Sequence, residues 1–88
     1  MQQILNRTSA SFTGLILPHE WDNAGQVTAI AILSPGEKEY VIQNEGKGLE
    51  LFNHIRKPVR VTGRLNCLPS GKHVVNVESY EIIAARAL

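Results

Sequence analysis

Short stretches in which apolar and polar residues alternate cover most of this chain, and clusters of glycine, proline and polar residues separate them. A period of two is typical of strands that bury one face, so the pattern predicts a protein built mainly of β-strands. We expect five strands, at residues 11–18, 26–33, 38–43, 58–67 and 73–83. Turns rich in proline and glycine, at 34–37 and 68–72, are expected to join the second strand to the third and the fourth to the fifth.

One segment, residues 44–57, breaks this alternation between the third and fourth strands. Its apolar residues recur at the spacing of one helical face: Leu49, Leu51, Phe52 and Ile55. Asn44 can cap the start of a helix, and Pro58 prevents the helix from continuing. A helix of about ten residues is not stable alone in water, so we expect this one to pack against the strands.

Three strands, a short helix and a two-strand hairpin follow one another in the order typical of an OB-fold barrel. Three segments carry this resemblance: GKGLELFNHI at 46–55, KPVRVTGRL at 57–65 and VNVESYEII at 75–83. They are similar to segments of small stand-alone bacterial OB-fold proteins. The resemblance implies an all-β, five-stranded Greek-key OB-fold barrel with one short helix between strands three and four. We expect a flexible N-terminal arm at 1–10, an OB-fold domain at 11–83 and a C-terminal tail at 84–88.

The composition limits the classes of function. The 88 residues suit one domain, and a net charge of +1 predicts no bulk attraction to nucleic acid or anionic membranes. Cys67 is the only cysteine, which excludes an intrachain disulfide and a thiolate metal cluster. The three histidines lie in separate predicted elements, so we expect no metal and no cofactor. We find no signal peptide and no apolar run near the ~20 residues of a membrane span, and expect a cytoplasmic protein.

The resemblance also implies a place for a ligand. OB-folds bind across the second and third strands and the flanking loops, and single-stranded nucleic acid is held by aromatic and basic side chains. The candidate residues for nucleic-acid binding are Trp21, Lys38, Tyr40, Arg60, Arg64 and Lys72. Trp21 has a second interpretation, in which it covers one end of the barrel as a lid.

The two arginines have a second interpretation as well. The turn at 68–72 predicts the pairs Cys67 with His73, Gly63 with Val77, Thr62 with Glu78 and Arg60 with Tyr80. In this register Glu78 lies diagonally between Arg60 and Arg64 and can neutralise both. Arg60 can also form a cation–π pair with Tyr80. The arginines would then be part of an ordinary solvated face.

An apolar patch is the alternative binding surface. A four-residue turn at 34–37 sets Ile30 opposite Val41, and we expect this more polar face of the second strand to point outward. It would then expose an apolar patch: Leu15, Ile30, Ile32 and Val41. Such a patch favours a protein partner or a second copy of the chain. With the opposite face outward, Tyr40 would be exposed and could stack on a base.

The sequence shows no set of nucleophile, base and orienting residue, and a chain of this size has little room for a closed catalytic pocket. We therefore expect a binding module and not an enzyme. Its expected ligand is single-stranded nucleic acid, with a protein partner or self-association as the alternative, and no membrane is expected to take part.

Overall fold

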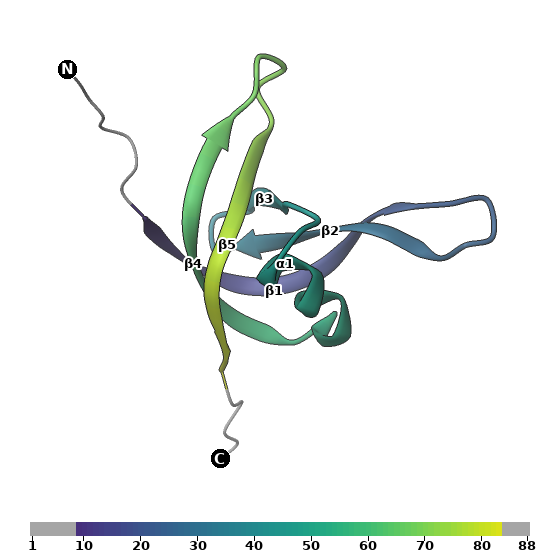
Figure 1. Ribbon diagram of the computed structural model, residues 1–88, viewed down its shortest axis with the longest axis horizontal. Coiled ribbons are helices and arrows are strands. Elements are labelled where there is room, and N and C mark those ends of the chain that lie inside the picture. Colours follow the sequence, from purple (N-terminus) through teal and green to yellow (C-terminus); the bar gives the residue numbers. More distant parts are fainter. Residues whose placement is uncertain (1–8, 84–88) are drawn as a thin grey trace.

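The computed structural model describes residues 9–83, which form an all-β barrel with one short helix (Figure 1). The strands are β1 Ala10–Trp21, β2 Val27–Ser34, β3 Lys38–Ile42, β4 Pro58–Cys67 and β5 His73–Ile82. The barrel is closed in the order β1-β2-β3-β5-β4, and the helix lies between β3 and β4 in the chain. This confirms the predicted fold class. Most of the predicted arm at 1–10 and the whole tail at 84–88 lie outside the described residues, but Ala10 already belongs to β1.

Strand β1 closes the barrel because it pairs with two different neighbours. Its first half pairs with β4 and its second half with β2, and Leu15 faces both Pro58 and Leu33. Next to this switch, a Cβ on Gly14 would lie 2.1 Å from the carbonyl oxygen of Leu33. Only glycine allows the two strands to come so close at this position.

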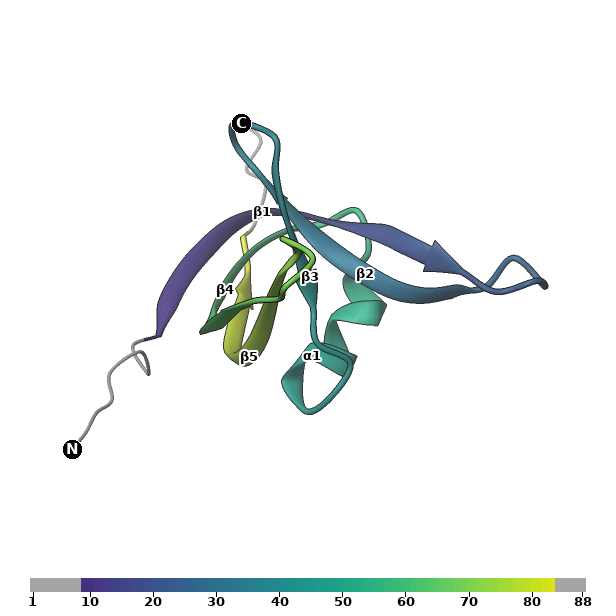
Figure 2. The ribbon, with the colours of Figure 1, turned by 90° about the horizontal axis from the view of Figure 1, so that it is seen from above.

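Beyond Pro18, β1 and β2 extend away from the barrel as a two-stranded arm that ends near Trp21 (Figures 1 and 2). The pairing in this arm shifts register between Pro18 and Glu20 and again between Glu20 and Trp21. Such bulges increase the twist of a strand pair, so the arm leaves the barrel at an angle.

The barrel interior is filled by aliphatic side chains of all five strands and of the helical segment: Ile16, Ile30, Ile32, Ile42, Leu51, Val59, Val61, Val75 and Val77. Each fully buried side chain of this kind stabilises the fold by about 1.5–3 kcal/mol. The helical segment is a single turn of α-helix, α1 Lys47–Glu50, followed by a 3₁₀ turn, η2 Leu51–His54.

The helical segment differs from the prediction in two details. Leu49 of the predicted apolar face is 52% exposed, whereas Leu51 of the same face is fully buried at the start of the tighter 3₁₀ turn. The residue that precedes the first helical turn is Gly46 (φ 60°), and the side chain of Asn44 instead donates a hydrogen bond to the carbonyl of Thr28 at 3.1 Å. The predicted cap at Asn44 is therefore wrong.

The pairing of β2 with β3 is shifted by one residue from the prediction. Ser34 pairs with Lys38, so the loop has three residues, and Gly36 and Glu37 both have positive φ (87° and 63°). The N–H of Glu37 donates to the carbonyl of Ser34 at 3.0 Å. A slip of one residue turns each side chain of one strand to the other face. Val41 consequently faces Ala31 and not Ile30.

The pairing of β4 with β5 follows the prediction from Cys67–His73 to Gly63–Val77 and then shifts by one residue. The shift leaves Glu78 as the extra residue, so Thr62 pairs with Ser79 and Arg60 with Glu81. The predicted pairs of Thr62 with Glu78 and of Arg60 with Tyr80 are wrong, because a bulge was not recognisable in the alternating pattern.

Candidate functional site

Three aromatic rings from three strands meet at the end of the barrel away from the helix. The ring centroid of Tyr40 on β3 lies 4.7 Å from that of Phe12 on β1 and 5.9 Å from that of His73 on β5. All three side chains are partly buried, and Phe12 and Tyr40 pack against the aliphatic core. They therefore cover this end of the barrel only in part, and we call it the open end.

A hollow of about 270 Å³ opens beside these rings, lined by Lys38, Glu39, Tyr40 and His73. Lys38 is exposed and brings a positive charge to the rim. Glu39 brings a carboxylate, which lies 3.5 Å from Nδ1 of His19 at the base of the arm. The hollow thus combines two π-faces with one ammonium group and one carboxylate.

Two of the predicted nucleic-acid residues, Lys38 and Tyr40, are brought together here, and Lys72 directly precedes His73 in the exposed β4–β5 loop. His73 and Phe12 were missed as candidates. The signal for His73 was its place in line with Val75 and Val77, which puts its ring on the inner face of β5.

Cys67, the last residue of β4, is exposed. Its Sγ lies 3.8 Å from Nε2 of His73, across the end of the β4–β5 hairpin.

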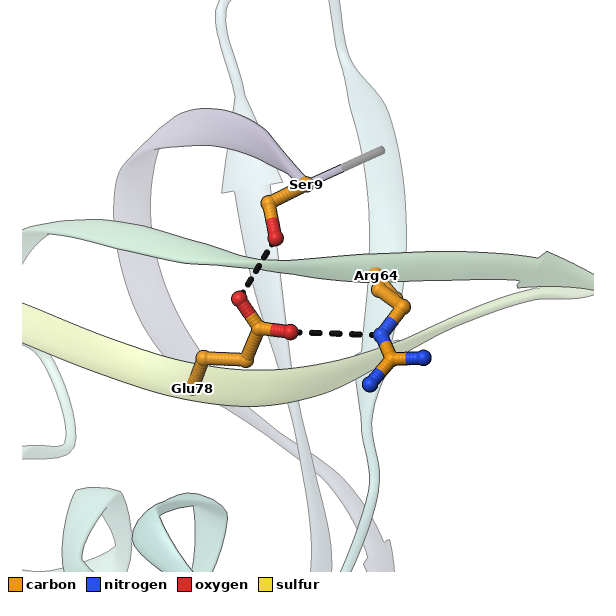
Figure 3. A network of polar contacts seen from close by, with 3 residues as sticks. All are labelled: Ser9, Arg64 and Glu78. Atoms are coloured by element: carbon orange, nitrogen blue, oxygen red, sulfur yellow. Dashed lines mark hydrogen bonds and ion pairs between the residues drawn. The ribbon is translucent and has the colours of Figure 1, made fainter. Parts of the chain in front are cut away.

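The two arginines on the outer face of β4 are engaged by carboxylates. Nη1 of Arg60 lies 3.4 Å from Oε1 of Glu81, and Nε of Arg64 lies 3.2 Å from Oε2 of Glu78 (Figure 3). The hydroxyl of Ser9 donates a second hydrogen bond to Glu78. These two donors, Ser9 first and Arg64 second, hold the pKa of Glu78 below its ordinary value.

The arginines therefore form a neutralised face, as one of the two interpretations proposed, but with different partners. Glu78 contacts Arg64. Because of the bulge at Glu78, the residue opposite Arg60 is Glu81, and Arg60 forms its ion pair with Glu81. Tyr80 pairs with Val61, and its side chain packs against the core, so the predicted cation–π pair with Arg60 is wrong.

Trp21 lies far along the arm and is 58% exposed. It is not a lid over the barrel. Its chain neighbours Glu20 and Asp22 are both acidic, and Oδ1 of Asp22 accepts hydrogen bonds from the backbone N–H groups of Ala24 and Gln26 at 2.9 Å. Trp21 is thus presented on an acidic loop, apart from the residues that line the hollow.

The shifted β2–β3 register corrects the prediction of an outward-facing apolar patch. Ile30 and Ile32 are fully buried in the barrel interior, so they cannot contribute to an exposed patch. Leu15 is 41% exposed and Val41 is partly exposed, as that prediction requires. On the outer face, Leu15 pairs with Leu33 and Val41 pairs with Ala31.

A second hollow of about 270 Å³ lies at the helix end, lined by Lys47, Glu50, Ser79 and Tyr80. The hydroxyl of Tyr80 donates to Oε1 of Glu50 at 2.8 Å, and this hydrogen bond raises the pKa of Tyr80 above its ordinary value. Nζ of Lys47 lies 3.8 Å from the other carboxylate oxygen. These groups satisfy one another and leave little for a ligand.

Within residues 9–83, no helix is long and apolar enough to span a bilayer, and no three potential ligands of the His, Cys, Asp or Glu type are grouped to hold a metal. Searches with the sequence and the structure find no matching protein-family model, curated protein or solved structure.

Proposed function

We propose that this chain is an OB-like binding module, not an enzyme, which contacts single-stranded nucleic acid at the open end of its barrel. The barrel is consistent with an OB-like fold in its strand order and in the place of its helix. The observation that carries the proposal is the hollow in which Tyr40 and His73 meet beside Lys38. A cytoplasmic location, as the sequence predicts, is compatible with this role.

One unstacked base is the ligand that this hollow suits. The ring planes of Tyr40 and His73 cross at 78°, so a base lying flat on one ring meets the edge of the other. Stacking on an aromatic side chain contributes about 1–3 kcal/mol per base and tolerates any sequence. The proposal thus moves the contact from the outer face of strands two and three to the barrel end.

Phosphate contacts are expected to be few. Lys38 borders the hollow and Lys72 lies in the adjoining loop, whereas Arg60 and Arg64 are paired with carboxylates. If two phosphates are neutralised, the logarithm of the binding constant falls with that of salt concentration with a slope of about −1.4. We therefore propose weak, moderately salt-dependent binding.

Fluorescence anisotropy of a labelled, mixed-sequence single strand at low salt tests the proposal. Tyr40→Leu and Lys38→Glu should each weaken binding about tenfold, because one removes a stacking surface and the other reverses a charge. Tyr80→Leu and Lys47→Glu are matched controls at the other end of the barrel and should leave the affinity unchanged. The proposal fails if the strand does not bind, or if the control variants weaken it as much.

A further inference from the structure

The outer surface of the barrel carries two rows of aliphatic side chains, which we call the outer apolar face: Leu15, Leu17, Ala31, Leu33, Val41 and Val74. The first row crosses four adjacent strands through the pairs Leu17–Ala31, Ala31–Val41 and Val41–Val74. The second is the pair Leu15–Leu33. The rows face outward because the residues next to them in the chain, such as Ile16, Ile32 and Ile42, fill the interior.

An aliphatic outer face differs from what the rest of this barrel shows. The outer face of β4 carries polar side chains: Arg60, Thr62, Arg64 and Asn66. A sheet that buries one face against its own core normally presents polar residues to water on the other. Ala31 is buried although it points away from the core, since Leu17 and Val41 flank it. The aliphatic side chains thus form a contiguous surface across β1, β2, β3 and β5.

The charges at the two ends of the second row have opposite signs. The row runs from Pro58 on β4 through Leu15 and Leu33 to Glu39 on β3. Lys57 directly precedes Pro58, is exposed, and has no carboxylate within ion-pair distance in the described part of the chain. Glu39, whose carboxylate also lies 3.5 Å from Nδ1 of His19, makes one end of the row acidic. Lys57, the chain neighbour of Pro58, brings a positive charge near the other end.

We propose that two copies of this chain dock through the outer apolar face about a two-fold axis, with Glu39 of each copy near Lys57 of the other. If the two-fold axis lies in the interface and is perpendicular to the second row, the rows of the two copies run in opposite directions. The acidic end of each row then lies against the basic end of the other. The same face offers a nucleic-acid strand no aromatic ring on which a base could stack. The charge pattern thus favours a second copy as the occupant.

Sedimentation velocity of the chain without nucleic acid, over a range of concentrations, tests this proposal. We expect a reversible shift from 9.7 kDa to twice that mass. Leu15→Glu should weaken the dimer about tenfold or more, because it buries a charge in the interface. Leu65→Glu is the matched control, since Leu65 on β4 is also 41% exposed but lies outside the outer apolar face, and it should leave the dimer intact.

Charge reversal tests the arrangement itself. Glu39→Lys should weaken the dimer, and the double variant Glu39→Lys/Lys57→Glu should restore it. Circular dichroism of each variant separates loss of the dimer from loss of the fold. A monomer at every concentration, equal effects of Leu15→Glu and Leu65→Glu, or no rescue by the double variant would overturn the proposal. Each measurement omits nucleic acid, so its failure leaves the proposed ligand at Tyr40 untouched.

Discussion

The ring of Tyr40 lies 4.7 Å from that of Phe12, with the two ring planes tilted by 53°. This contact joins β3 to β1, which are not neighbours in the barrel order. The rings therefore meet across the barrel end instead of along a strand pair, and they support the wall of the hollow that Tyr40 and His73 share. The stability of the open end and the shape of the proposed binding site depend on the same side chain.

The contact between Phe12 and Tyr40 should be measurable as a coupling free energy. Tilted aromatic pairs contribute about 0.5–1.5 kcal/mol beyond the area they bury. In a double-mutant cycle of Phe12→Leu and Tyr40→Leu, followed by urea unfolding, we expect a coupling in this range. The cycle Phe12→Leu with Tyr80→Leu is the control, and its coupling should be near zero. A zero coupling for the first pair would show that the rings do not meet.

Gly63 should not tolerate a side chain. A Cβ there would lie 2.2 Å from the carbonyl oxygen of Asn76, at the point where the β4–β5 register shifts. Gly63→Ala should therefore lower the free energy of unfolding by roughly 1–3 kcal/mol, as overpacking does. Asn66→Ala, at an exposed position of the same strand, should change it by about 0.5 kcal/mol or less. Equal effects of the two substitutions would contradict the close approach of the strands.

Glu78 should make stability depend on pH in the acid range. Its pKa is lowered in the folded chain by Ser9 and Arg64, so its contribution is present above the ordinary value of 4.5. The contribution is lost as the pH falls through the lowered folded-state pKa. Glu78→Gln should therefore be less stable than the parent chain at neutral pH, and the two should converge in acid. Urea unfolding at both pH values measures this, and a constant difference would rule it out.

Tyr80 should make the stability of the fold depend on pH in the alkaline range. Its pKa is raised by the hydrogen bond to Glu50, so its contribution is present below the ordinary value near 10 and is lost as the pH rises through the higher folded-state pKa. Tyr80→Phe should remove the tyrosinate absorbance that develops above the ordinary tyrosine pKa. If the absorbance that Tyr80→Phe removes develops at the ordinary value instead, this hydrogen bond is excluded.

Periodicity was sufficient to predict five strands and their order along the chain, although β1 continues to Trp21 instead of ending at Pro18. The closed barrel was implied by the resemblance. The alternating pattern of β4 ended where the structure ends it, at Cys67, and the β4–β5 register was right as far as Gly63. The errors arose where a single residue shifts the register of a strand pair and so changes which side chains face the barrel interior. Glu37 adopts a positive φ without being glycine, which shortens the loop before β3, and the bulge at Glu78 shifts the far half of β5. Neither feature has a signature in local composition.

The candidate site was predictable only in part, for a related reason. Lys38 and Tyr40 were predicted because both lie on β3, one of the two strands across which a ligand was expected to bind. The partners of Tyr40, which are Phe12 and His73, come from strands distant in sequence, so only the closed barrel brings them together. The carboxylates that neutralise Arg60 and Arg64 likewise follow from the register of β5, which the sequence pattern determined incompletely.

An NMR titration of the isotopically labelled chain with a mixed-sequence single strand at low salt tests the central proposal most directly. We expect chemical-shift changes centred on Lys38, Tyr40 and His73 that diminish as salt is added. Changes confined to the outer apolar face, or none at any residue, would contradict it.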